Sequence, residues 1–458
     1  MIELGPWLER AVAEVQAWAA THGEYDTHPS LAVSDAQLAA AFDAFGARLH
    51  DNYPFFHPRY AGQMLKPPHP VAVVGYLAAM LINPNNHALD GGPATAAMEK
   101  EVVADLAAMF GFDTHLGHLT SSGTIANLEA LYVARQIHPD RGIAYSADSH
   151  YTHARMCGVL GVAGQSVPVD ARGRMDLDAL ESLLRSGKIG TVVLTAGTTG
   201  LGAIDPIDQA LPLAGRYGVR LHVDAAYGGF FTLLGRDGAE GIPSAPWVAI
   251  AKCDSVVVDP HKHGLQPYGC GAVLFRDPSV GRFYVHDSPY TYFTSNELHL
   301  GEISLECSRA GASAAALWLT LRLLPLTRDG LGAVLAAGRR AAMRWADLIE
   351  SSEWLELYQK PELDIVTLYP RTPAASLSAI DGASERMLER GMSDTDDPVF
   401  LSVLRAEAPA FQARHPEVTQ DSENARIVRS VLMKPETETY LDWLHGRVER
   451  LARDVASG

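Results

Sequence analysis

Hydrophobic residues near the start of the chain recur with the period of a helix. They recur at three- and four-residue steps, first at Leu8, Val12 and Val15 and later at Leu38, Phe42 and Phe45. Such spacing places apolar side chains on one face of an α-helix. Prolines and aromatic residues crowd positions 52–58 and predict an irregular connection. We therefore expect an N-terminal helical segment over residues 1–65.

Beyond residue 116 the pattern changes to short apolar strands that alternate with helical stretches. The clearest strands cover residues 191–195, 220–224 and 255–259, and valine recurs in them. Strands that are apolar on both faces are typical of a parallel sheet covered by helices. Pro206 suits the first turn of a helix over 206–217. This alternation predicts an α/β layer architecture.

The pattern changes again near residue 325. A helix, a short strand at 365–369 and further helices follow. A chain of 458 residues is long enough for more than one domain. We expect a large domain over 66–325 and a small C-terminal domain over 326–458.

The charge balance and the cysteines narrow the class of protein. The formal net charge of −17 disfavours non-specific binding to nucleic acid or to an anionic membrane. The four cysteines form no CxxC pair, which predicts neither a disulfide framework nor a zinc site but a reducing compartment. The N-terminus lacks an apolar signal core, and the longest apolar stretch, at 71–82, is too short to span a bilayer. We expect a cytoplasmic protein.

Residues 120–127 predict a turn that opens a helix. Ser122 or a neighbour can cap that helix, and Gly123 lets the backbone approach a ligand closely. Free N–H groups and the helix dipole make such a turn an anion site. A simple capped helix is the plainer interpretation, and this segment alone favours it.

An acid and a lysine follow two of the predicted strands. Asp224 ends one strand at the sheet edge where open parallel sheets bind ligands, and a carboxylate there can keep a heteroaromatic nitrogen protonated. Ala226 lies on the same side and is small enough for a flat ring to lie over it. Taken singly, Asp224 is more often a turn cap.

Lys262 lies just beyond the third strand, between His261 and His263. In such semi-apolar surroundings a lysine loses its proton more readily and can form an imine, although most lysines are solvated loop residues. The two histidines are possible metal ligands, as are His150 and His153. No carboxylate or cysteine at suitable spacing completes the set, so we expect no metal.

Six separated segments together resemble the group II pyridoxal-phosphate decarboxylases of fold type I. That family includes aromatic amino acid, glutamate, histidine and tyrosine/aspartate decarboxylases. The segments are Ser122–Thr124, Ser146–His150, Ala196–Gly200, His222–Tyr227, Asp259–Lys262 and Glu306–Gly311. They occur in order between about His57 and Leu323, which makes chance agreement improbable.

Two positions depart from the family pattern. His263 stands where aromatic decarboxylases usually carry tryptophan, and Ile125 stands where many members carry an acid. The first departure argues against naming an aromatic substrate.

The resemblance implies an α/β, fold type I pyridoxal-phosphate transferase-like architecture. This fold has a mostly parallel seven-stranded sheet with flanking helices, an N-terminal helical dimerisation segment and a small α+β C-terminal domain. It also implies a homodimer with shared active sites, in which Ser308 contributes to the partner's phosphate site. The cofactor is then pyridoxal 5′-phosphate, bound by Ser122, Gly123, Thr124, His150, Thr198, Asp224, Ala226, Asp259, His261, Lys262 and Ser308.

The implied reaction converts an L-amino acid to its amine and carbon dioxide through a Schiff base on Lys262. Asp224 keeps the pyridine nitrogen protonated, and His150 stacks on the ring face opposite Ala226.

A proton must then reach the substrate Cα, and a polar, aromatic loop at 288–294 carries the candidates. We favour Tyr292 as donor and keep Tyr290 as the second candidate; packing at a subunit interface explains either tyrosine about as well. His69 and Tyr290 are expected to border the substrate side chain, although His69 fits a core histidine equally well.

Two other functions are compatible with the same residues. Some related enzymes are aldehyde synthases, which decarboxylate with oxidative deamination, and others are carbon–carbon lyases. A non-enzymatic binding protein on the same scaffold is expected to have lost Lys262 or Asp224, and this chain retains both.

Overall fold

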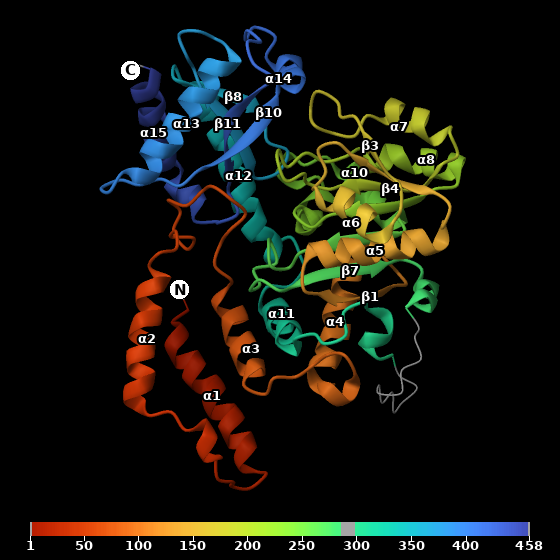
Figure 1. Ribbon diagram of the computed structural model, residues 1–458, viewed down its shortest axis with the longest axis vertical. Coiled ribbons are helices and arrows are strands. Elements are labelled where there is room, and N and C mark those ends of the chain that lie inside the picture. Colours follow the sequence, from red (N-terminus) through yellow and green to blue (C-terminus); the bar gives the residue numbers. More distant parts are fainter. Residues whose placement is uncertain (1, 285–297, 457–458) are drawn as a thin grey trace.

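Two β-sheets organise the protein. The computed structural model describes residues 2–284 and 298–456 and contains a seven-stranded and a four-stranded sheet (Figure 1). The larger sheet has the order β1-β7-β6-β5-β4-β2-β3. Its strands are β1 (Leu116–Thr120), β2 (Gly142–Ser146), β3 (Gly164–Val167), β4 (Ile189–Thr195), β5 (Arg220–Asp224), β6 (Ser255–Val258) and β7 (Gly271–Phe275).

Only β7 runs antiparallel to its neighbours in this sheet, β1 and β6. The other pairs are parallel. The prediction of a mostly parallel seven-stranded α/β sheet is confirmed.

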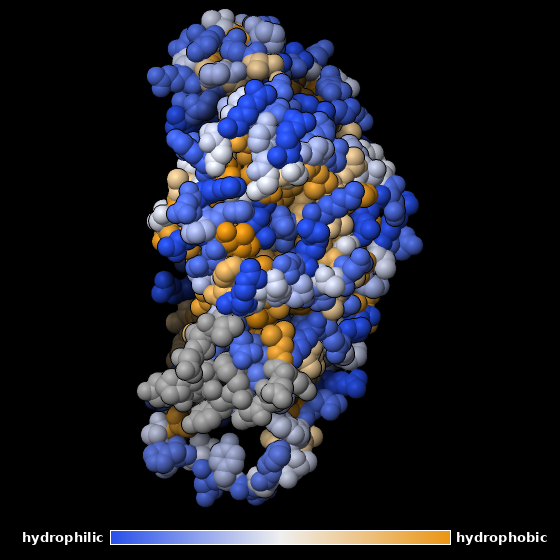
Figure 2. All heavy atoms as spheres, turned by 90° about the vertical axis from the view of Figure 1, so that its right-hand side faces the viewer, coloured by the Kyte–Doolittle hydropathy of each residue, from blue (hydrophilic) through white to orange (hydrophobic). Residues whose placement is uncertain are grey.

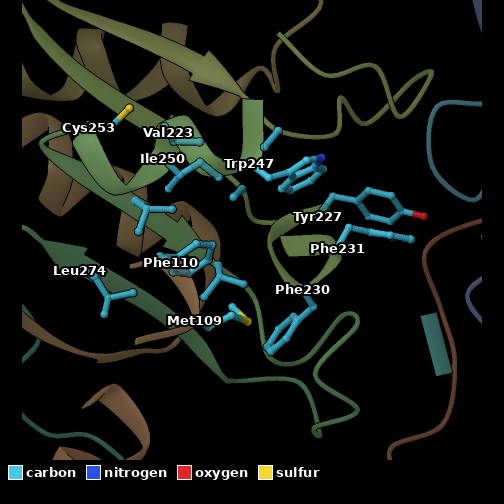
Figure 3. Close-up of a cluster of buried hydrophobic side chains, with 14 of the residues drawn as sticks. Met109, Phe110, Val223, Tyr227, Phe230, Phe231, Trp247, Ile250, Cys253 and Leu274 are labelled. Atoms are coloured by element: carbon cyan, nitrogen blue, oxygen red, sulfur yellow. The ribbon is translucent and has the colours of Figure 1, made fainter. Parts of the chain in front are cut away.

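The sheet is apolar on both faces because helices cover both. Val256 and Val258 face one hydrophobic core, whereas Val257 between them faces another. The first core includes Phe110 and Trp247, and Figure 3 shows both packed near the strands. The helices of this part are α3 (Pro70–Met80), α4 (Pro93–Phe110), α5 (Gly123–Ile137), α6 (Thr152–Leu160), α7 (Leu177–Leu184), α8 (Ile207–Tyr217), α9 (Thr232–Gly235), α10 (Ser244–Ala249) and α11 (Gly311–Leu323).

Two helix starts bear on the predictions. Helix α5 begins at Gly123 with Ser122 as its cap, as expected. Helix α8 begins at Ile207, one residue later than expected, because Pro206 has the non-helical backbone angles of the cap position.

The C-terminal part contains the four-stranded sheet, in the order β10-β11-β9-β8 with every pair antiparallel. Its strands are β8 (Leu355–Gln359), β9 (Ile365–Pro370), β10 (Ser402–Glu407) and β11 (Asn424–Val431). Helices α12 (Leu331–Glu350), α13 (Leu377–Ser393), α14 (Ala408–Arg414) and α15 (Thr437–Ala456) accompany it. A separate core around Trp345, Leu368 and Leu444 holds sheet and helices together.

The N-terminal helices α1 (Leu4–Ala20) and α2 (Asp35–Leu49) extend away from the body of the molecule (Figure 1). Both predicted helices are present, but their apolar faces differ in burial. Leu8, Val12 and Val15 of α1 are half-buried and α1 packs against α3, whereas the apolar face of α2 is exposed. Helix α2 has no buried residue, and Phe42 is 64% exposed. By contrast, the side of the molecule shown in Figure 2 is mostly hydrophilic with scattered apolar patches. Within 2–284 and 298–456, no helix combines the length and the apolar character needed to cross a bilayer.

Candidate active site

A cavity of about 230 Å³ opens at the carboxyl ends of β4, β5 and β6. The register aligns these ends, because Thr195 pairs with Asp224 and Asp224 pairs with Val257. Nine of the residues expected at the cofactor line it: Ser122, Gly123, Thr124, His150, Asp224, Ala226, Asp259, His261 and Lys262.

One end of the cavity is formed by the start of α5. The Ser122 hydroxyl accepts a hydrogen bond from the Ile125 N–H at 3.3 Å, so the helix is capped from within. A Cβ atom on Gly123 would lie 2.5 Å from Oδ2 of Asp259. A larger residue at this point would collide with the Asp259 carboxylate, and the start of a helix is a general anion-binding position.

Asp224 forms another wall and is 5% exposed. Its Oδ2 lies 2.8 Å from Nε2 of His153, and its Oδ1 accepts the Ala226 N–H at 3.1 Å. Burial by itself raises the pKa of this carboxyl, but His153 and the Ala226 N–H outweigh it and hold the pKa well below the usual range. Asp224 is therefore a stable anion at the cavity.

His153 is a functional residue that sequence reasoning did not assign beyond a possible metal ligand. The only available signal was its spacing of three residues from His150 at the start of a helix. Its ring is fully buried and bonded to Asp224, so it orients that carboxylate.

Lys262 lies in the turn after β6, with Nζ 3.1 Å from Oδ2 of Asp259. The neighbouring His261 donates from Nδ1 to the Cys270 carbonyl at 2.7 Å, and burial lowers its pKa. His263, unlike His261, does not line the cavity. Its side chain turns away from the cavity, to the Tyr227 carbonyl and to Asp364.

His150 lines the cavity from the segment between β2 and α6. Its Nδ1 accepts the Thr152 N–H at 3.3 Å, and its ring lies beside Tyr151 with centroids 4.2 Å apart. Burial lowers the pKa of His150 despite the opposing charge of Asp224. The ring is therefore a neutral, half-buried surface near neutral pH.

Two of the residues expected at the cofactor lie outside this cavity in the single chain. Thr198 faces an adjoining cavity of about 380 Å³, and its hydroxyl accepts the Ala203 N–H. Its neighbours Gly197 and Thr199 line the first cavity instead. Ser308 lines a separate cavity of about 200 Å³ behind Thr120 and Ser121.

His69 caps helix α3, where its Nδ1 accepts the Val71 N–H. His69 is not among the residues that line the cavity in the single chain. Tyr290 and Tyr292 lie outside the described residues.

The sequence does not predict the adjoining cavity of about 380 Å³. It shares His150, Tyr151 and Thr199 with the first and extends to β10 and α14 of the C-terminal part. No local pattern indicates it, because its walls come from segments far apart in the chain.

The chain resembles known proteins in sequence and in fold. The model of the pyridoxal-dependent decarboxylase conserved domain matches residues 55–369. An L-tyrosine decarboxylase of Enterococcus faecium is 29% identical, covering 81% of this chain and 78% of its own length. A probable L-tyrosine/L-aspartate decarboxylase of Methanosphaerula palustris is 30% identical, covering 69% and 84%.

Solved structures share the fold. Mouse CSAD superimposes with a TM-score of 0.79 at 23% identity, over 98% of both chains. Oryza sativa TDC with PLP and tryptamine gives a TM-score of 0.80 at 16% identity, again over 98% of both. These fold type I neighbours confirm the fold class. The family model spans more than half of the chain, and the chain therefore belongs to the pyridoxal-dependent decarboxylase family.

Proposed function

We propose that the protein decarboxylates an L-amino acid to the amine and carbon dioxide, with pyridoxal 5′-phosphate attached to Lys262 as a Schiff base. The observation that carries the proposal is the cavity that joins Lys262, Asp224 and the start of α5. These three provide an amine, a buried anion and an anion-binding turn, which are the groups that the aldehyde, the pyridine nitrogen and the phosphate require.

The remaining cavity residues fit the same cofactor. His150 and Ala226 supply an aromatic ring and a small side chain for the two faces of a flat ring. Ser122, Gly123 and Thr124 line the cavity at the start of α5, which is the end proposed for the phosphate. His261 and Asp259 adjoin Lys262 at this end.

The bound cofactor supplies an electron sink when a bond at the substrate Cα breaks. The residues of the chain do the rest. Asp224, held by His153, keeps a proton on the ring nitrogen, and His150 orients the substrate amine and carboxylate. We assign Tyr292 to proton delivery at Cα, with Tyr290 as the second candidate. Tyr290 and His69 are assigned to the substrate side chain, with Thr198 at the turn beside the cofactor.

The relatives act on amino acids with several classes of side chain. The relatives are named for tyrosine, 2,4-diaminobutyrate and, as probable activities, tyrosine and aspartate. These relatives are named decarboxylases, which favours amine formation over the aldehyde synthase alternative.

The test is to supply purified holoenzyme with each standard and related L-amino acid and to measure carbon dioxide, amine, ammonia and hydrogen peroxide. Equal amounts of carbon dioxide and amine are expected from at least one substrate. Ammonia with peroxide would indicate the aldehyde synthase, and no carbon dioxide from any amino acid would contradict the proposal.

A homodimer completes the proposed site. The exposed apolar face of α2 and the exposed Trp7 and Trp18 of α1 need a covering surface, since a patch of this kind is unfavourable in water. Ser308 lines the separate cavity beside Thr120 and Ser121, not the cavity at Lys262 of the same chain, which fits a role at the partner's phosphate site. We accordingly assign residues 1–65 to dimerisation, 66–325 to the cofactor-binding domain and 326–458 to the small domain.

Sedimentation at assay concentration tests the dimer, and a fully active monomer would contradict it. The cytoplasmic location stays a prediction, which fractionation of the source cells tests.

A further inference from the structure

The side chain after the proposed Schiff-base lysine joins distant parts of the fold. His263 is buried and donates from Nδ1 to the Tyr227 carbonyl at 2.9 Å. Its Nε2 donates to Oδ2 of Asp364 at 2.8 Å. Its ring packs edge to face against Tyr227 and Phe231, with ring centroids 4.7 and 5.1 Å away. One side chain therefore connects the turn that carries Lys262 to the segment after β5 and to the C-terminal part.

Asp364 lies just before β9 and reaches back to the cavity. Its Oδ1 accepts the Tyr227 hydroxyl at 2.5 Å, and Tyr227 lines the cavity beside Ala226. Its own backbone is fixed within the C-terminal part, where its carbonyl accepts the Leu432 N–H at 2.9 Å. One carboxylate thus bonds both the residue after Ala226 and the residue after Lys262.

The turn that carries Lys262 leads into a strained residue. Leu265 directly follows the turn with a φ of 62°, in the left-handed region that bulky side chains rarely adopt. Such a conformation persists only where the surrounding contacts impose it. The contacts here are the two hydrogen bonds of the His263 ring and the Leu265 carbonyl, which accepts the His69 N–H at 2.9 Å. The direction of the Lys262 side chain therefore depends on them.

An imine forms only when the lysine nitrogen meets the cofactor aldehyde in the right geometry, and a displacement of about 1 Å can cost about a hundredfold. In the proposed function the ring lies on Ala226. We propose that Asp364 is a positioning residue for the reaction. Through His263 and Tyr227 it holds the lysine nitrogen in place relative to the wall on which the ring lies. The inference rests on the proposed function and deepens it: the C-terminal part sets the imine geometry, although none of its described residues lines the cavity.

Two ligands separate positioning from binding. Pyridoxal phosphate forms the imine, whereas pyridoxine phosphate carries an alcohol in place of the aldehyde and only binds. The ratio of their dissociation constants on the apo-protein isolates imine formation, because the phosphate and ring contacts cancel. Asp364→Asn should lower the preference for pyridoxal phosphate about tenfold or more and change the affinity for pyridoxine phosphate by less than about twofold. Both titrations are made well below the thermal midpoint of the least stable variant.

A double variant tests whether the acid acts through the histidine. His263→Phe keeps a ring between Tyr227 and Phe231 but removes both donors, so the same preference should fall. Adding Asp364→Asn to His263→Phe should then lower the preference by less than about threefold more. Losses that multiply in the double variant would show independent effects and overturn the inference.

Tyr227→Phe tests the other bond of the carboxylate without changing any charge. It removes the hydroxyl that donates to Asp364 and leaves the ring in the cavity wall. The preference for pyridoxal phosphate should fall at least about threefold. This variant decides the question if Asp364→Asn does not fold, and an unchanged preference would overturn the inference.

Glu362→Gln is the matched control, because this acid lies two positions before Asp364 and is also buried. It accepts hydrogen bonds from Arg174 and from the Ile204 N–H, and His263 is not among its partners. The control should weaken the fold and leave the preference for pyridoxal phosphate unchanged. An equal fall in the control would overturn the inference, because the loss would then follow stability alone.

The outcomes separate this inference from the proposed function. Affinities for both ligands that fall together in Asp364→Asn would show a general loss of binding and overturn the inference. A preference that does not change in this variant would overturn it as well. If borohydride traps no pyridoxal phosphate on Lys262 of the wild-type protein, the proposed function fails first.

Discussion

The buried pair behind Lys262 gives a stability prediction that the structure allows to be worked out. His263 donates from Nδ1 to the Tyr227 carbonyl at 2.9 Å and from Nε2 to Oδ2 of Asp364 at 2.8 Å. Because both ring nitrogens face acceptors, both carry hydrogens and the ring is an imidazolium. The Tyr227 hydroxyl donates to the other carboxylate oxygen, Oδ1, at 2.5 Å. Figure 3 shows this hydroxyl pointing away from the hydrophobic cluster.

Asp364 therefore satisfies two buried donors and one buried charge. His263 is 2% exposed and Asp364 is 1% exposed. Burial by itself raises the pKa of Asp364, but the charge of His263 and the hydrogen bonds from His263 and Tyr227 lower it. The pair contributes stability at pH values above the ordinary aspartate range, and this contribution is lost as the pH falls through the lowered value.

Asp364→Asn leaves the imidazolium uncompensated and turns an NH₂ group towards one of the two donors. Removing one partner of a buried ion pair costs about 3–5 kcal/mol. We expect the variant to lose about this much free energy of unfolding, measured from denaturant midpoints of the apo-protein at pH 7.

The control is Asp442→Asn, which removes an exposed partner of Arg344 and should leave the midpoint nearly unchanged. A loss below about 1 kcal/mol in Asp364→Asn would refute the assigned charges. The deficit should also shrink as the pH falls through the lowered pKa of the Asp364 carboxyl, because the wild-type carboxylate then takes up a proton itself; a deficit independent of pH would point to packing instead.

Three further predictions follow from other sites. Gly123→Ala should weaken pyridoxal phosphate binding about tenfold or more because its Cβ meets the Asp259 carboxylate, whereas Gly158→Ala, with open space around it, should not; equal affinities would contradict the close approach. Tyr292→Phe should lower amine formation about a hundred- to ten-thousand-fold while Tyr290→Phe retains it; the reverse pattern would move proton delivery to Tyr290. Lys66 has a buried Nζ without a hydrogen-bond partner among the described residues, and burial lowers its pKa from 10.5 to about 7. Between these two values the unfolded chain holds a proton that the folded chain lacks, so wild-type stability should rise with pH from 7 to 10.5, and Lys66→Met should abolish that rise.

Much of the fold could be predicted because its signals are local. The strand predicted at 220–224 matches β5 residue for residue, and the strand predicted at 365–369 matches β9 within one residue. Short runs that are apolar on both faces leave few alternatives to a buried parallel strand. The residues that line the cavity could also be predicted from the sequence. The ends of parallel strands meet at one edge of the sheet, and each motif follows such an end.

The remaining features depend on contacts between distant segments. His263 and Asp364 are 101 positions apart, and nothing near either residue indicates the other. The sequence suggested that His263 would act beside Lys262, and the pairing with Asp364 removes it from the cavity. His153 was similarly hidden, since its partner Asp224 is 71 positions away. His69 caps its own helix, and a single histidine before a proline does not predict this role.

The central claim is that Lys262 holds the cofactor, and borohydride trapping tests it most directly. Reduction of the yellow holoenzyme should fix a pyridoxyl group that survives digestion, and mass spectrometry should find it on the peptide containing Lys262. Burial also lowers the pKa of Lys66 and Lys434, so these are the competing amines to inspect. A single label on Lys262 is the predicted result. A label on Lys66, on Lys434 or on no lysine would contradict the account.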